Sequence, residues 1–329
     1  MMRPPKPLTF ALLRLLADGE FHSGQVLAQQ LGMSRASVNN ALRDVDVYGL
    51  ELYSVRGRGY RLAKPVEWLD AGRITEGLGD LCKYFFIEIL DSAPSSNTLL
   101  LQQADHGVVS GSVLAVEWQS GGRGRLGRMW HSGLGNALTF SLLWRFDCGL
   151  SGLSGLSLAV GVAIMRVLHE LGVENAKLKW PNDVLGEEGK LAGILIEAQG
   201  DMLGPSAVVI GIGLNLSLPR SVSSQIDQPV ACLADMLDDP PERNLLLAVL
   251  LKELHAVLRE FGAHGFAGLR AEWTHYHALQ NHPVQLLLPD GSRVNGIVRG
   301  AAEDGALELD TGEGLRRFNA GEISLRSVV

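Results

Sequence analysis

The sequence predicts a multidomain α+β protein with an N-terminal winged helix-turn-helix, a central domain on a mixed sheet, and a small C-terminal β-barrel. The 329 residues exceed one ordinary domain. The apolar spacing changes from helical to mixed and then to strand-like along the chain. Residues 1–64 hold nine Lys and Arg against five Asp and Glu, whereas the whole chain has a net charge of −7. Only the basic head is therefore expected to meet a polyanion, which excludes a protein that coats nucleic acid along its whole length. We place the domain boundaries at 1–65, 66–280 and 281–329.

The head has the spacing and caps of three short helices. Residues 8–17 show helical apolar spacing, and Ser23 can cap a helix over 24–32. Gly32 turns the chain, and Ser34 can cap a third helix. The predicted inward residues are Val26, Leu27 and Leu31 on the second helix, and Val38, Leu42 and Val45 on the third.

The outward face of the third helix and the segment after it carry residue types that suit DNA. Arginines and short polar side chains reach phosphates and base edges in a major groove. Residues 50–55 and 60–63 alternate like strands around RGRG at 56–59, which predicts a wing with arginines at its tip. A winged helix used only for protein contacts is the alternative. The predicted DNA-binding residues are Ser34, Arg35, Ser37, Asn39, Asn40, Arg43, Arg56 and Arg58.

The remaining bulk features predict a cytoplasmic protein that does not enter a membrane. The three cysteines are far apart in the sequence, and this sparse, odd-numbered set indicates reduced thiols rather than disulfides. The N-terminus imitates a signal peptide, but Arg14 interrupts its apolar run and no cleavage site follows. Residues 148–165 approach the length of a membrane span, yet their serines and glycines favour a buried helix.

The body alternates strand and helix signals. We expect a linker with a possible short helix over 64–80, then a strand and a helix capped near Ser95 within 85–107. Further strands are expected over 112–119, 136–146 and 206–218. Residues 176–200 read as a strand, a tight turn at 186–189 and a second strand; helices are expected near 154–172, 242–262 and 266–280. Adjacent strands with few helices between them predict a mixed sheet rather than a parallel one.

The segment GGRGRLGRMWHSGLGN, at 121–136, is the strongest chemical signal. It contains G-x-G-x-x-G, and Asp147 lies at about the sequence distance at which a dinucleotide-binding domain has its ribose-binding acid. The residues after Gly127 are unlike a helix, however, and this argues against a dinucleotide-binding site. A Walker phosphate loop is excluded because no GK[ST] follows. Arginines on a glycine-rich loop suit a carboxylate or a triphosphate, since guanidinium forks and open backbone amides both bind anions. We expect this loop to be disordered when empty and ordered when bound, with Trp130 shielding the closed site.

The motifs together resemble one family. GGRGRLGRMW, KWPND, KLAGILIE and GIGLNL occur in the order found in biotin–protein ligases. GMSRASVNN, RGRGYRL and GEISLRS look like the bifunctional bacterial type, which also represses biotin-synthesis genes. The resemblance covers the whole chain and implies a central domain of the class II synthetase or biotin ligase-like fold. It further implies an SH3-like barrel over the C-terminal residues.

The activity implied by the resemblance is that of a biotin–[acetyl-CoA-carboxylase] ligase. Biotin and ATP, with Mg²⁺, give biotinyl-adenylate and pyrophosphate, and a lysine of a biotin carboxyl carrier protein then takes the biotinyl group. By this resemblance Lys190 and Arg125 are catalytic, and Lys190 would bridge the carboxylate and the α-phosphate. The bland alternative is a solvated lysine in an acidic turn.

The remaining roles are carried over in the same way. Asp183 is either a Mg²⁺ ligand or the partner that orients the lysine, and Lys179 beside Trp180 is possibly structural. The family's aromatic residue over adenine is missing, because no aromatic lies between Pro219 and Leu237, so the cover near Val230 is open. The implied biotin-binding residues are Ser95, Ser96, Asn97, Gln119, Arg123, Gly124, Arg125 and Lys190. The implied nucleotide-binding residues are Arg125, Arg128, Trp130, Lys179, Asn182, Asp183 and Asn215.

The resemblance also implies operator DNA as a partner and a homodimer promoted by the adenylate, because paired half-sites need paired heads. The C-terminal barrel either contributes to ATP or carrier binding or is a structural cap. Two other functions remain open. A metabolite-sensing repressor would bind biotin without releasing pyrophosphate, and a lipoate ligase would share the body's fold without this arginine-glycine loop.

Overall fold

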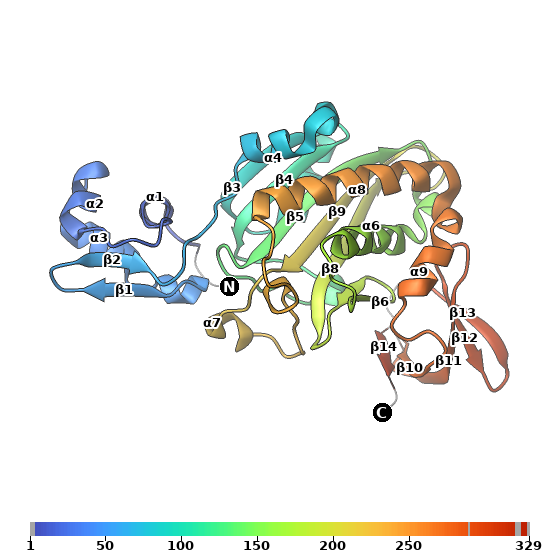
Figure 1. Cartoon of the computed structure of the whole chain (residues 1–329). Helices are drawn as coiled ribbons and strands as arrows, with labels where there is room; N and C mark the ends of the chain where they lie inside the picture. The colour runs from blue at the N-terminus through green and yellow to red at the C-terminus, as the bar shows by residue number, and fades with distance from the viewer. Residues whose placement is uncertain (1–3, 289, 320–323, 328–329) are drawn as a thin grey trace.

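The computed structural model describes residues 4–288, 290–319 and 324–327. The three parts follow one another along the molecule, with the head at one end and the barrel at the other (Figure 1). This arrangement confirms the predicted fold: a winged helix-turn-helix, a mixed-sheet domain and a small antiparallel barrel.

The head forms as its caps and apolar spacing predict. Its helices are α1 (Pro7–Leu15), α2 (Gly24–Gln30), α3 (Arg35–Leu42) and the short η1 (Val45–Tyr48), followed by a wing of β1 (Leu52–Val55) and β2 (Gly59–Leu62). Ser23 and Ser34 accept hydrogen bonds from the backbone N–H groups of Val26 and Ser37 and so cap α2 and α3. The prediction for Val26 is wrong: it is 44% exposed, because Leu27 and Ala28 fill the inward face of the short α2.

The central domain is built on a seven-stranded sheet in the order β3-β4-β5-β9-β8-β7-β6. Only β3 and β4 are parallel neighbours; the other pairs are antiparallel, so the sheet is mixed as predicted. The strands are β3 (Phe86–Ala93), β4 (Ser112–Gln119), β5 (Ala137–Phe146), β6 (Lys177–Lys179), β7 (Asp183–Leu185), β8 (Lys190–Gly200) and β9 (Ser206–Asn215).

The prediction of a single strand before the turn at 186–189 is wrong. Pro181, which follows Trp180 through a cis peptide bond, interrupts the segment. The chain reverses there, so that β6 pairs with β7 before β8 begins. The motif residue Asn182 therefore lies in the turn between β6 and β7, and Asp183 is the first residue of β7.

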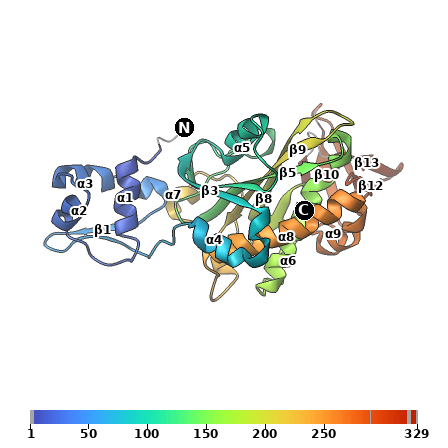
Figure 2. The same ribbon diagram turned by 90° about the horizontal axis from the view of Figure 1, so that it is seen from above.

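Helices cover both faces of the sheet. One face packs against α4 (Ala71–Leu78), α6 (Leu156–Glu170) and α8 (Arg243–His264), with α9 (Arg270–Tyr276) beside α6. The other face carries α5 (Ser96–Asp105), as the view from above shows (Figure 2). The expected possible helix in the linker is α4, and it belongs to the core, since Ile74 and Leu78 are buried.

One segment of the described chain, Leu150–Glu170, is long and apolar enough to cross a membrane by length and composition alone. Most residues of α6 within it are buried against the sheet and α8, as expected for the central helix of a folded domain. The prediction of a buried helix with small residues at its packing surface agrees with Gly161, whose Cα faces Leu178 closely.

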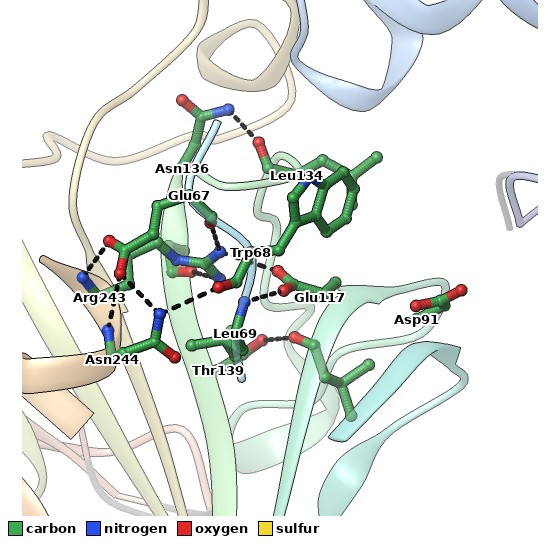
Figure 3. A network of polar contacts seen from close by, with 12 residues as sticks. Glu67, Trp68, Leu69, Asp91, Glu117, Leu134, Asn136, Thr139, Arg243 and Asn244 are labelled. Carbon is green, nitrogen blue, oxygen red and sulfur yellow. Dashed lines mark hydrogen bonds and ion pairs between the residues drawn. The ribbon is translucent and has the colours of Figure 1, made fainter. Parts of the chain in front are cut away.

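A buried polar network fixes the linker between head and body (Figure 3). Arg243, at the start of α8, donates to the backbone oxygens of Glu67 (2.6 Å) and Ala137 (3.1 Å) and forms a 2.9 Å ion pair with Glu117. Glu117 in turn accepts from the backbone N–H of Leu69 at 2.6 Å. The Glu117 carboxylate is completely buried, so its charge is balanced by these donors rather than by water.

The head also touches the body directly. The Tyr48 ring packs edge-to-face on Trp118 of β4, with 5.4 Å between ring centroids, and the Tyr48 carbonyl accepts from the N–H of Leu134. Trp118 is thus part of the head's core although it belongs to the sheet.

The C-terminal barrel has the strand order β13-β12-β11-β10-β14. Its strands are β10 (Pro283–Leu287), β11 (Arg293–Ala301), β12 (Leu307–Thr311), β13 (Gly314–Phe318) and β14 (Ser324–Ser327). Trp180 joins it to the central domain by donating its indole N–H to the carbonyl of Gly305 at 3.1 Å. Of the motif GEISLRS, at 321–327, the first three residues lie outside the described residues.

Candidate active site

A cavity of about 750 Å³ opens on the face of the sheet that carries α5. Alternate residues of β9 explain the opening: Ile210, Ile212 and Leu214 face the core under α6 and α8, whereas Gly211 and Gly213 face the other side. Because these glycines have no side chains, Asn97 at the start of α5 can lie over Gly211, and the cavity extends past it over Gly213. Gly193 of the neighbouring β8 extends the same floor.

Polar groups from the start of α5 form one end of the cavity. Ser95 caps the helix through the N–H of Thr98, and Gln119 at the end of β4 accepts from the N–H of Ser96 at 2.7 Å. The Asn97 carboxamide lies over Gly211, where a Cβ would come within 2.1 Å of its oxygen. A glycine is therefore required at position 211 for Asn97 to reach the floor.

Ser141 of β5 is a site residue that the sequence analysis missed. Its hydroxyl is 2.8 Å from the Ser96 hydroxyl and donates to the Asn97 Oδ1 at 2.5 Å, although the residue is fully buried. Thr139 and Ser141 are buried hydroxyl residues in an otherwise largely apolar strand, and this was the available signal, because buried hydroxyls need hydrogen-bond partners.

The arginine-glycine loop folds over the cavity as a tight hairpin. Gly124 N donates to the Arg128 carbonyl and Trp130 N to the Gly122 carbonyl, both at 2.8 Å. Leu126 and Gly127 have left-handed backbone angles at the tip. The expectation that the empty loop is disordered stays a prediction.

The Trp130 indole lies on the glycine floor. A Cβ on Gly213 would approach the ring to 2.4 Å, and one on Gly193 to 3.4 Å. The ring therefore occupies space that any larger residue at position 213 would claim, and it forms an apolar wall beside the polar end of the cavity.

Cationic groups gather at the opposite end. Lys190, the first residue of β8, points its amine to within 2.6 Å of Asp183 Oδ1. Arg125 donates to Asn182 Oδ1 at 3.3 Å. Burial, together with the neighbouring Arg128, lowers the pKa of Arg125 against the opposing effect of Asp183. Two cationic side chains, Lys190 and Arg125, thus line this end of the cavity, which suits an anionic ligand.

The segment 225–230 closes the cationic end. Gln225, Ile226, Asp227, Gln228 and Val230 line the cavity, and the backbone of 229–231 pairs with Lys190. Near Val230, where the resemblance led us to look for an aromatic residue over adenine, the cavity is lined by aliphatic and polar side chains.

The predicted ligand-binding residues come together, although they are drawn from six separate segments of the chain. All of the following line the one cavity: Ser95, Ser96, Asn97, Gln119, Arg123, Gly124, Arg125, Arg128, Trp130, Lys179, Asn182, Asp183, Lys190 and Asn215. Glu197, which the sequence analysis did not single out, borders this site and pairs with Arg123.

The predicted DNA-binding residues lie apart from the cavity, on the head. Ser34 uses its hydroxyl as the cap of α3, and Asn39 accepts from the Tyr60 hydroxyl at 3.2 Å. Arg43 donates to Asn40 at 2.6 Å. Arg56 and Arg58 are exposed on the turn of the wing, where Arg58 stacks on Phe21. The head therefore presents a basic hairpin next to a polar helix.

Comparison with known proteins agrees with this geometry. Residues 90–215 match the biotin/lipoate A/B protein ligase family, residues 8–61 an HTH domain, and residues 281–326 the biotin protein ligase C-terminal domain. The chain is 38% identical to the bifunctional ligase/repressor BirA of Escherichia coli, over 96% of both chains. It is 33% identical to the biotin–[acetyl-CoA-carboxylase] ligase of Mycobacterium tuberculosis, over 72% of this chain and 88% of the relative.

A solved structure gives the same result. The biotin protein ligase of Aquifex aeolicus in complex with biotin and ATP has a TM-score of 0.63 and 27% identity, covering 74% of this chain and 99% of that one. The fold and cavity define a ligase domain joined to a winged helix. The chain belongs to the biotin protein ligase family, and its matches along nearly the whole length include bifunctional ligase/repressors.

Proposed function

We propose that this protein joins biotin to ATP as biotinyl-5'-adenylate and then transfers the biotinyl group to a lysine of a biotin carboxyl carrier protein. The supporting observation is the cavity's polarity: a neutral hydrogen-bonding end at Ser96 and Asn97, an apolar wall at Trp130, and a cationic end at Lys190 and Arg125. Biotin has the same sequence of groups, namely a polar ring, an aliphatic tail and a carboxylate.

In the first step a carboxylate oxygen of biotin attacks the α-phosphorus of ATP, and the bond to the bridging oxygen breaks to release pyrophosphate. Both reactants are anions, so the cationic end lowers their repulsion and holds them at reacting distance. The Lys190 amine would contact the carboxylate and the α-phosphate oxygen, and its ion pair with Asp183 would orient it. The guanidinium of Arg125 is suited to bidentate contact with phosphate.

In the second step a carrier lysine amine attacks the acyl carbon of the anhydride, AMP leaves with the bonding electron pair, and the new amide nitrogen loses its extra proton to solvent. Lys190 would stabilise the departing phosphate oxygen. Gln225–Val230, at the same end, would cover the nucleotide base with aliphatic and amide groups.

We also propose Mg²⁺ as the accompanying ion. Asp183 is one carboxylate at the phosphate end, and no group of three or more metal-ligating side chains occurs among the described residues. This set fits an ion held mainly by phosphate oxygens and water, with Asp183 as the candidate protein ligand. When bound, the ion would neutralise phosphate charge.

Pyrophosphate exchange tests the ligase activity. Labelled pyrophosphate should enter ATP when biotin is present and should not when lipoate replaces it. Mass measurement should then show one biotinyl group on a carrier domain. Biotin binding without exchange would favour the sensing repressor instead, and exchange with lipoate would favour a lipoate ligase.

We propose further that the protein represses a biotin operon as a homodimer promoted by the adenylate. The head's winged helix supports this, as do the bifunctional relatives. The proposed DNA contacts are the polar face of α3 and the wing arginines. The proposed domain boundaries are 1–65, 66–280 and 281–329, and all of these DNA contacts lie in the first domain. Three free cysteines support a cytoplasmic location.

Operator binding tests the repressor role. Affinity for the protein's own operator region should rise when biotin and ATP are both added, together with a shift from monomer to dimer in sedimentation. Arg56→Ala in the wing should weaken binding to all sequences alike and reduce its salt dependence, because phosphate contacts are lost. Equal DNA affinity with and without ligands would discard the link between the two functions.

A further inference from the structure

Arg123 differs from Arg125 and Arg128 of the same loop because its guanidinium forms an ion pair with Glu197. Its guanidinium nitrogen is 2.5 Å from Glu197 Oε2. Glu197 is seven residues beyond Lys190 on β8, which corresponds to roughly 23 Å along an extended strand. Arg123 is therefore neutralised at the polar end of the cavity and is not one of the cations gathered around Lys190.

The same carboxylate fixes the direction of Asn97. The Asn97 amide nitrogen is 3.1 Å from Glu197 Oε2 and 3.2 Å from the Leu195 carbonyl. Both amide hydrogens are then directed to β8, and Oδ1 is left to accept from Ser141. Residues two apart in a strand point to the same face, so Glu197 lies on the same side of β8 as Gly193 and Leu195, which line the cavity.

Fixing Arg123 also fixes the opposite arm of its hairpin. Arg123 pairs with Met129 across the hairpin, and the Trp130 N–H donates to the Gly122 carbonyl. The arm that carries Trp130 therefore follows the arm that carries Arg123. The polar end and the apolar wall of the cavity depend on one carboxylate.

We propose that Glu197 is a positioning residue for the biotin-binding half of the site. It acts through Arg123, which holds the arginine-glycine loop closed, and through Asn97, whose amide it orients. It does not touch the reacting atoms, so replacing it should weaken biotin binding and leave the rate of the chemical step largely unchanged. This inference rests on the proposed function.

The test is a double-mutant cycle with Glu197→Gln and Arg123→Gln in the full chain. Glutamine at 197 keeps an oxygen for Asn97 but removes the charge. Each single change should raise the KM for biotin in pyrophosphate exchange about tenfold and leave the KM for ATP within twofold. The double variant should be no weaker than the weaker single one, because both changes break the same pair. Calorimetric biotin affinity should fall in parallel.

Asp310→Asn is the matched control, since it breaks the half-exposed Arg299–Asp310 pair in the barrel and should leave the biotin KM unchanged. If Glu197→Gln does not fold, Arg123→Gln alone reports on the pair from the exposed loop. Unchanged biotin KM in an otherwise active protein, or additive effects in the double variant, would overturn this inference alone. A wild-type protein without biotin-dependent exchange would overturn the proposed function instead.

Discussion

The Lys190 amine lies 2.6 Å from the Asp183 carboxylate, across the turn that joins β7 to β8. The pair is partly buried, with about a fifth of each side chain exposed. An ion pair of this kind restricts a flexible lysine to one direction. Of the two roles considered for Asp183, orientation of the lysine is thus supported by a direct contact.

Removing either partner of this pair should slow adenylation to different extents. Lys190→Ala removes the cation that offsets growing phosphate charge, and exchange should fall about 100- to 1,000-fold. Asp183→Asn keeps the lysine but releases it, so kcat should fall about tenfold. Glu188→Gln, in the same turn, is the control. Full activity of Lys190→Ala would contradict the proposed mechanism.

Enlarging the glycine floor should displace the tryptophan wall. In Gly213→Ala the new Cβ would stand 2.4 Å from the Trp130 ring, so the ring must move. We expect the KM for biotin to rise about tenfold. Gly312→Ala meets nothing within 4 Å and should leave the KM unchanged. Steady-state exchange at varied biotin measures both, and equal KM values for the two variants would show that Trp130 does not form the wall.

Breaking the linker network should destabilise the protein strongly. Arg243→Met leaves the fully buried Glu117 carboxylate without its cationic partner, which typically costs about 3–5 kcal/mol. Adding Glu117→Gln should recover part of this loss by removing the orphaned charge. Denaturant unfolding measures the difference, and no recovery in the double variant would mean that the charge is not the cause.

Stability should fall on acidification because of His277. Burial lowers the pKa of this residue to about 4. An unfolded histidine titrates near 6.5, so between pH 6.5 and 4 the unfolded chain binds the extra proton. The contribution is therefore fully present above about pH 6.5 and decreases by up to about 3 kcal/mol as the pH falls towards 4.

Two substitutions isolate this effect. His277→Leu should flatten the decline in unfolding free energy between pH 6.5 and 4, whereas the exposed His275→Leu should preserve it. Parallel pH profiles for wild type and His277→Leu would assign the decline to other groups.

The sequence predicts most of the fold because local signals and tertiary packing agree. Ser23, Ser34 and Ser95 cap the helices they precede, and burial alternates with a period of two along β10 and most of β11. The errors lie where tertiary contacts decide. Pro181 reverses the chain inside an apparently continuous strand, and Val26 is exposed because Leu27 and Ala28 fill the inward face of its helix.

The motifs contain the residues expected to line the cavity, but Ser141, which lies outside them, and Glu197, the last residue of KLAGILIE, were not singled out. Ser141 and Glu197 lie in strands that read as apolar or amphipathic, and their partners are distant in sequence. Sequence spacing alone cannot reveal that Glu197 forms an ion pair with Arg123 rather than with Arg125 or Arg128. Which arginine pairs with Glu197 depends on where the folded loop crosses the sheet.

Three consecutive residues of β4 serve three different parts of the molecule. Glu117 holds the linker, Trp118 belongs to the head's core, and Gln119 accepts from Ser96 in the cavity. Deleting or inserting one residue in this strand would reverse which side each chain neighbour faces. A shift of one residue in β4 would therefore disturb the linker, the head's core and the polar end of the cavity together, whereas a substitution would alter only one of these contacts.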